Sequence, residues 1–112
     1  MKYKVFVYGT LKKGKANHCI IQHCKGYKAY APGIDLFAGP NFPFAKRGSR
    51  IAIGEVYEVD QETLVRLDRL EGHPTFYQRE KTNVLINGSR SQAWIYLFPN
   101  ADKYPAVADG EW

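Results

Sequence analysis

The stretch IAIGEVYEVDQETLVRLDRLEG, residues 51–72, decides the fold class because it joins a strand pattern directly to a helix pattern. Residues 51–59 alternate between apolar and polar side chains well enough for a half-buried strand. Asp60 then offers the side-chain oxygen that favours a helix N-cap, and residues 61–71 have helical spacing. Gly72 is the residue type that most often ends a helix. We therefore expect a strand that leads into a capped helix.

Further strand patterns lie on both sides of this stretch. They cover Lys2–Tyr8, Lys25–Ala31, Gly33–Ala38, Phe76–Ile86 and Ser91–Phe98. Asn87-Gly88 predicts a hairpin turn between the last two, and Asn17 could cap a short helix over residues 18–24. Gly54, inside the strand 51–59, indicates a bulge or a close backbone approach. The pattern predicts an α+β fold, with a small mixed or antiparallel β-barrel of about six strands and short flanking helices.

The size and composition of the chain fit one domain. Its 112 residues, 45% hydrophobic and 24% charged, predict a single domain over residues 1–112. The net charge of +5 comes from scattered basic residues without a block of like charges, so nucleic-acid binding is not favoured. No signal peptide and no apolar run of membrane-spanning length is visible, and two cysteines are too few for a disulfide framework. We expect a cytoplasmic protein with neither a membrane nor a nucleic acid as partner.

Glu71 is the candidate catalytic residue that helix geometry singles out. At about 100° per residue, Leu64, Leu67 and Leu70 form an apolar stripe, and Glu71 points where they point. Burial and the negative end of the helix dipole both raise the pKa of such a carboxyl, which makes it a better base near neutral pH. The alternative is that the helix frays at its end and Glu71 meets water or a basic side chain.

Other groups of polar residues favour structural roles. His18, Cys19, His23 and Cys24 resemble a metal cluster, but five residues along a helix is about 140° of rotation, so the like pairs diverge. We therefore expect no metal site. Asp68 lies on a flank of the predicted helix and is expected to face solvent, as are Arg66 and Arg69. His73 is expected to be a solvated turn residue.

The stretch VYGTLKKGK, residues 7–15, is a strand that runs into a glycine turn and then into positive charge. It lacks the Gly-Lys-Ser/Thr order of a phosphate-binding P-loop. A glycine turn at a strand end can still present backbone N–H groups to a carboxylate. We therefore expect the loop backbone to bind a carboxylate, with Lys12, Lys13 and Lys15 as solvated neighbours.

Five segments occur together in an order that is similar to a known family: VFVYGTLKKGKANH, GEVYEVD, LDRLEGHPTFYQRE, AWIYLF and DGEW. The chain resembles the γ-glutamylcyclotransferase-like family, and within it the γ-glutamylamine cyclotransferase and AIG2-like branch. The resemblance runs from Val5 to Trp112, almost the whole chain. The pairing of YGTL with LDxLEG…YxR, about 60 residues apart, is the specific part of the pattern.

The resemblance implies a barrel fold and an intramolecular lyase-type acyl transfer. In that reaction the α-amine of a γ-glutamyl group attacks its own γ-amide carbonyl, which closes 5-oxoproline and releases an amine or amino acid. The family's acid/base carboxylate falls on Glu71, and its substrate-binding loop on Tyr8, Gly9, Thr10 and Leu11, with Tyr77 as a further pocket residue. The implied nucleophile belongs to the substrate, so neither a metal nor a cofactor is implied.

The resemblance leaves the leaving group open. A lysine side chain, a simple amine, an antibiotic precursor and a glutathione-like peptide are all compatible with it. The segment FAGPNFPFAKRGSR, in the region that shapes the leaving-group pocket in the family, is short and individual here. The alternative function is a non-catalytic module that keeps the fold and binds a carboxylate or γ-glutamyl ligand. Neither the oligomeric state nor the pathway follows from the sequence.

Overall fold

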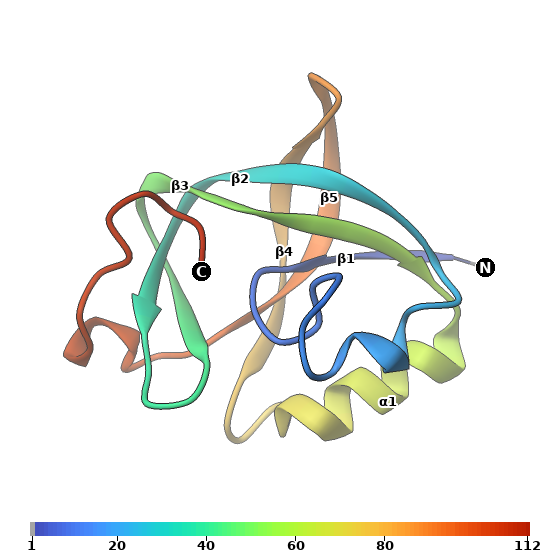
Figure 1. The fold of residues 1–112 in the computed structure, drawn as a ribbon, viewed down its shortest axis with the longest axis horizontal. Helices are drawn as coiled ribbons and strands as arrows, with labels where there is room; N and C mark the ends of the chain where they lie inside the picture. Colours follow the sequence, from blue (N-terminus) through green and yellow to red (C-terminus); the bar gives the residue numbers. More distant parts are fainter. Residues whose placement is uncertain (1) are drawn as a thin grey trace.

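The computed structural model describes residues 2–112, which form a closed five-stranded barrel with one α-helix against it (Figure 1). The elements, in chain order, are β1 (Tyr3–Val7), the 3-10 turn η1 (His18–Ile20), β2 (Lys25–Ala38), β3 (Pro43–Val59), α1 (Gln61–Glu71), β4 (Gln78–Ile86), β5 (Ser89–Leu97) and the 3-10 turn η2 (Ala101–Lys103). The strand order is β1-β3-β2-β4-β5, and β1 closes the barrel by pairing parallel to β5 at Val5 and Trp94. All other pairs are antiparallel.

The helix begins and ends where the sequence predicts. The Asp60 side chain accepts a 2.8 Å hydrogen bond from the Thr63 N–H, which satisfies one free donor of the first turn. At the other end Gly72 takes the left-handed conformation, with φ 67°, that glycine adopts most easily. The close backbone approach expected at Gly54 is confirmed, because a side chain there would meet the Val7 carbonyl oxygen at 2.3 Å.

The strand count is five rather than about six, because the two strands expected over 25–31 and 33–38 are one. β2 continues through a register shift between Pro32 and Ile34, a bulge in its pairing with β3. β3 is also longer than expected and begins at Pro43. The proline and glycine at 32 and 33 therefore bend the strand without ending it.

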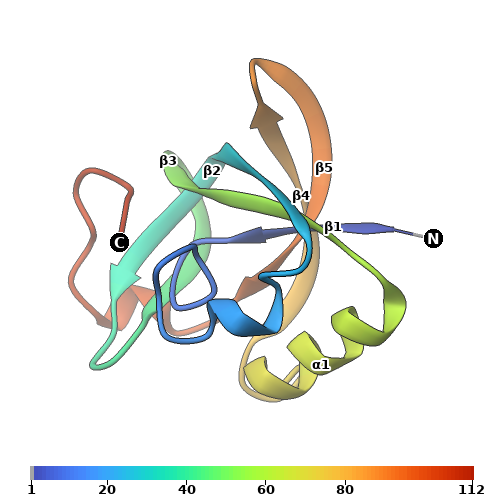
Figure 2. The same cartoon turned by 45° about the vertical axis from the view of Figure 1, so that its right-hand side comes forward.

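The predicted helix over 18–24 is wrong; only His18–Ile20 make a 3-10 turn. Asn17 makes no side-chain cap, because its amide donates instead to the Thr10 hydroxyl at 2.9 Å. This segment folds back on the loop that follows β1, and both ribbon views place that loop beside α1 (Figures 1 and 2).

Buried side chains form two clusters on the two faces of the barrel wall. Phe6 of β1 belongs to the first, with small and branched residues of the other strands. Its neighbours Val5 and Val7 belong to the second, which contains Leu64 and Leu67 of α1. Successive residues of a strand point to opposite faces, so β1 is buried on both sides. The end of β1 is thereby fixed between the barrel interior and the helix.

Candidate active site

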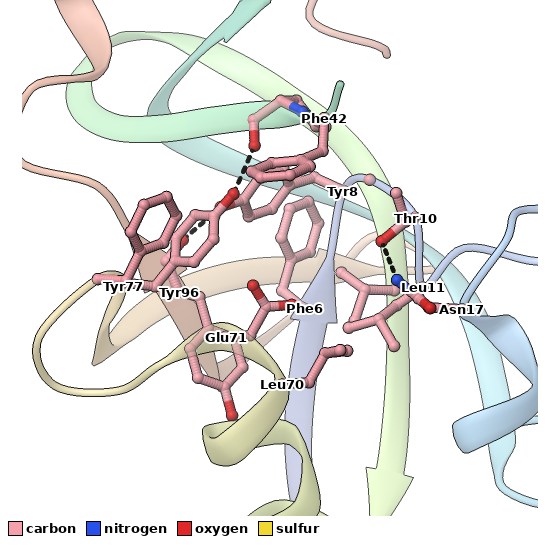
Figure 3. A pocket seen from close by; sticks show the side chains of 14 residues that line it. Phe6, Tyr8, Thr10, Leu11, Asn17, Phe42, Leu70, Glu71, Tyr77 and Tyr96 are labelled. Carbon is pink, nitrogen blue, oxygen red and sulfur yellow. Dashed lines mark hydrogen bonds between the residues drawn. The ribbon is translucent and has the colours of Figure 1, made fainter. Parts of the chain in front are cut away.

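A cavity of about 150 Å³ opens where the end of β1, the β2–β3 loop and the end of α1 meet (Figure 3). Its lining residues are Phe6, Val7, Tyr8, Gly9, Thr10, Leu11, Asn17, Phe42, Pro43, Leu70, Glu71, Phe76, Tyr77 and Tyr96. All six residues expected to act in the site are among them. The structure thus brings together residues that lie more than 60 positions apart in the chain, while their chemical roles stay predictions.

The loop after β1 turns sharply at Gly9. A side chain at Gly9 would meet the ring of Pro43 at 2.8 Å, so the close approach of the first residue of β3 requires glycine. The Lys12 N–H donates to the Gly9 carbonyl at 3.1 Å, and the Asn17 N–H donates to the Thr10 carbonyl at 2.8 Å. These bonds fix the conformation of the loop.

Three successive N–H groups of this loop have no acceptor within the described protein. Across residues 2–112, no protein acceptor takes a hydrogen bond from the N–H of Gly9, Thr10 or Leu11. Successive free backbone N–H groups form a concave site for a carboxylate or an oxyanion. The loop therefore brings three backbone donors without a protein acceptor to the lining of the cavity.

Glu71, the last residue of α1, points its carboxyl into the cavity beside Tyr77 and Phe6 (Figure 3). Within the described part of the chain it takes part in no ion pair and no side-chain hydrogen bond. Burial raises its pKa to about 7. A carboxyl with this pKa can both accept and return a proton near neutral pH.

The apolar stripe of α1 does not end as predicted. Leu64 and Leu67 are buried, but Leu70 is 43% exposed at the cavity mouth. At 100° per residue, Leu70 lies 120° from Leu64 around the helix, whereas Glu71 lies only 20° from it. Glu71 therefore continues the stripe into the cavity, and Leu70 lies on its flank.

Three tyrosines surround the cavity and are held in place by their hydroxyls. Tyr8 donates to the Tyr96 carbonyl, and Tyr77 donates to the Pro43 carbonyl at 2.9 Å. Burial raises the pKa of all three hydroxyls, which therefore stay neutral at physiological pH. The role of Tyr96 at the cavity was not predicted. Its signal in the sequence is its position in the alternating pattern of the last strand.

Asp68 does not face solvent freely, and that prediction is wrong. It pairs with Arg79 of β4 through two hydrogen bonds, of 2.8 and 3.0 Å, and accepts a 2.7 Å bond from the Tyr96 hydroxyl of β5. Burial opposes its charge, but the bonds from Arg79 and Tyr96 outweigh that effect and hold its pKa below the usual value. Asp68 thus ties the last turn of α1 to the barrel, three residues before Glu71.

Two further expectations need correction. Lys12 is not a solvated neighbour but 6% exposed, and its Nζ donates to the main-chain oxygen of Trp112 at 2.6 Å. His73 is not merely a solvated turn residue, because its Nδ1 accepts a 2.9 Å hydrogen bond from the Arg79 N–H. Both residues hold segments beside the cavity rather than lining it.

Within residues 2–112, no group of three or more His, Cys, Asp or Glu side chains is placed to bind a metal ion. Helices long and apolar enough to cross a membrane are also absent from this part of the chain.

Comparison with known proteins gives consistent matches. The model of the family described as "Gamma-glutamyl cyclotransferase, AIG2-like" matches residues 5–112. A Methanocaldococcus jannaschii protein provisionally named a gamma-glutamylcyclotransferase is 38% identical over 111 residues, which cover 90% of this chain and 88% of that protein. The Bos taurus gamma-glutamylaminecyclotransferase is 37% identical over 114 residues, 90% of this chain and 67% of its own. The crystal structure of YkqA from Bacillus subtilis superposes with a TM-score of 0.83 at 27% identity; the match covers all of this chain but 40% of that one.

Proposed function

Because this chain belongs to the gamma-glutamyl cyclotransferase, AIG2-like family, we propose that it is an enzyme that cyclises a γ-glutamyl amide to 5-oxoproline and releases the amine. The observation that carries the proposal is the position of Glu71, a carboxyl with a pKa of about 7 in a cavity that is also lined by residues whose backbone N–H groups have no protein acceptor. A base beside an anion site suits a substrate that carries an ammonium next to a carboxylate.

In this proposal, the N–H groups of Gly9, Thr10 and Leu11 bind the α-carboxylate and the γ-carbonyl oxygen of the glutamyl group. Tyr8 and Tyr77 confine it from the sides. A chain held bent in this way keeps the α-nitrogen close to the γ-carbon, which removes much of the entropic barrier to ring closure. The N–H groups then also stabilise the oxyanion that forms on the carbonyl oxygen.

Glu71 acts as the proton carrier. Its ionised form takes a proton from the α-ammonium, and the resulting amine attacks the γ-carbon, forming the ring C–N bond. Collapse of the tetrahedral intermediate breaks the bond from the γ-carbon to the leaving nitrogen. Overall two protons move from the α-nitrogen to the leaving nitrogen, and Glu71 relays them one at a time. The amine leaves as an ammonium ion, so the reaction needs no outside oxidant, reductant or co-reactant.

The test is 5-oxoproline release from a panel of γ-glutamyl amines and γ-glutamyl amino acids. The exchange Glu71→Gln keeps the shape of the side chain but removes the base, so we expect kcat to fall at least ~100-fold. The matched control is Glu62→Gln, which alters an exposed carboxyl in the first turn of the same helix and should leave the rate within about twofold. An unaltered rate in Glu71→Gln would exclude the mechanism. Tight binding of the panel without any turnover would instead favour a non-catalytic binding module.

A further inference from the structure

Three apolar side chains form the mouth of the cavity beside Glu71, and we call them the apolar rim: Phe42, Leu70 and Phe76. Leu70 and Phe76 are 43% and 44% exposed, and Phe42 is half-buried. Apolar side chains that gather at a cavity mouth, rather than scattering over the surface, indicate contact with a ligand.

The apolar rim is fixed in position. The Phe76 N–H donates to the Gly72 carbonyl at 2.8 Å, within the turn that follows Glu71. The Phe76 ring packs edge-on to Tyr77, with 5.2 Å between ring centroids, and lies 6.4 Å from the Phe42 ring. Paired aromatic rings at these distances hold one another in place. The two rings of the rim are thus held against one another, and one short turn separates Phe76 from Glu71 in the chain.

The cavity contains a single acidic or basic side chain. Among the described residues that line it, Glu71 is the only Asp, Glu, Lys, Arg or His. In the proposed reaction Glu71 is engaged by the α-amine of the substrate. A charged group on the departing amine would therefore find no oppositely charged partner among the remaining lining residues, whereas an apolar group could bury surface against the rim.

We propose that the apolar rim binds the leaving group, and that the preferred substrates are γ-glutamyl amides of amines bearing an aryl or branched alkyl group. This inference rests on the proposed function, since it names the substrate class of the same site. The glutamyl part occupies the end of the cavity lined by Gly9–Leu11, Glu71 faces the scissile amide, and the apolar substituent leaves across Leu70 and Phe76.

Three synthetic amides test the preference directly. γ-Glutamyl phenethylamide offers a ring to the rim, γ-glutamyl 5-aminopentylamide offers a chain of similar length that ends in an ammonium, and γ-glutamyl methylamide offers almost nothing. We expect kcat/KM for 5-oxoproline release to be at least ~10-fold higher for the phenethylamide than for either of the others. Equal values, or a preference for the aminopentylamide, would overturn the inference.

Variants locate the preference at the rim. We expect Leu70→Ala and Phe76→Ala each to lower the ratio of kcat/KM for phenethylamide over methylamide at least ~5-fold. Leu70→Ala places the residue with the highest helix propensity at an exposed helix position, so this variant should fold. It therefore still tests the assignment if Phe76→Ala does not fold. The controls are Val65→Ala and Tyr30→Ala, which remove equally exposed apolar side chains, 42% and 40%, that do not line the cavity. A ratio that stays the same in both rim variants, or falls equally in the controls, would overturn the assignment.

A binding measurement distinguishes a wrong leaving-group preference from a wrong proposed reaction. Calorimetric titration of Glu71→Gln with the phenethylamide and the methylamide measures affinity without turnover. If the wild-type protein releases 5-oxoproline neither from these three amides nor from the γ-glutamyl panel, the proposed cyclisation is wrong. Tighter binding of the phenethylamide, by at least ~10-fold, would then still support the rim as an apolar subsite. Equal affinity would exclude it.

Discussion

Glu71 carries its carboxyl into an apolar cavity, where no ion pair or side-chain hydrogen bond from the described residues compensates its charge. Desolvation therefore favours the protonated form and raises its pKa to about 7. The same burial that makes Glu71 a useful base opposes the folded state whenever the carboxyl is ionised. The raised pKa of Glu71 leads to two predictions, one for the pH dependence of turnover and one for the pH dependence of stability.

The pH dependence of turnover is the first. Because the base must be ionised, kcat/KM should rise with pH to a midpoint near 7 and fall about tenfold per pH unit below it. The measurement is 5-oxoproline release under first-order conditions between pH 5 and pH 9. The acid limb should be absent from the residual activity of Glu71→Gln. A wild-type midpoint near the ordinary glutamate value of 4.5 would contradict a desolvated base.

The pH dependence of stability is the second. The folded pKa of Glu71 lies above its unfolded value, so the folded state binds the proton more tightly and loses stability as pH rises from about 4.5 to 7. The loss approaches ~3 kcal/mol for a shift of this size. Glu71→Gln, which cannot ionise, should match the wild type at pH 4 and exceed it by ~1–3 kcal/mol at pH 8 in urea unfolding. A stability difference that is the same at both pH values would contradict the shift.

At the scale of elements, the cavity depends on how the end of α1 meets β4 and β5. Asp68 joins all three by bonding to Arg79 and Tyr96, and the Arg79 guanidinium also stacks on Trp94 with 4.3 Å to the ring centroid. The pair is partly buried, with Asp68 20% exposed. Its geometry is bidentate, which is the arrangement that contributes most among arginine–carboxylate pairs.

We expect Asp68→Asn to destabilise the fold by about 1–2 kcal/mol, because it leaves the Arg79 charge without its partner. It should also lower kcat, since the last turn of α1 positions Glu71. The matched control is Asp102→Asn, which breaks an ion pair between two exposed side chains, Asp102 at 57% and Lys46 at 41%, and should leave the free energy of unfolding nearly unchanged. Urea unfolding of both variants measures the difference. Equal effects would mean that Asp68 has no special structural role.

The elements also indicate what sequence patterns can and cannot predict. The helix over 61–71 was predicted with its bounds because its cap, its stripe and its stop are all local signals. The fusion of two expected strands into β2 was not, because the bulge at Pro32–Gly33 is stabilised by pairing with β3. The solvent exposure predicted for Asp68 was wrong for the same reason. Its partners, Arg79 and Tyr96, lie on β4 and β5, and the periodicity of a helix does not predict which strands pack beside it.

At the scale of the whole molecule, the C-terminal tail is bound across the barrel. The Val107 N–H donates to the Leu36 carbonyl of β2 at 2.8 Å, and the Gly110 carbonyl accepts from the Ile53 N–H of β3 at 2.8 Å. Beyond them the Trp112 oxygen accepts from Lys12, in the loop that follows β1. Figure 1 shows the tail beside β2 and β3. The tail thereby connects the long β2–β3 hairpin with the loop that lines the cavity.

Gly110 is the position at which this attachment can be tested. Its φ of 76° already disfavours a side chain, and a Cβ there would lie 2.2 Å from the Ile51 carbonyl oxygen, so Gly110→Ala must move the tail away from β3. Gly88→Ala is the matched control, because Gly88 has φ 79° in the β4–β5 turn but no atom within 4 Å of an added Cβ. The control carries only the conformational cost of about 1 kcal/mol, and Gly110→Ala should cost ~1–3 kcal/mol more in urea unfolding. Since the tail also holds Lys12, Gly110→Ala should raise KM for the γ-glutamyl substrate, whereas Gly88→Ala should not. Equal stability and equal KM in the two variants would show that the tail contributes nothing to the barrel or to the loop.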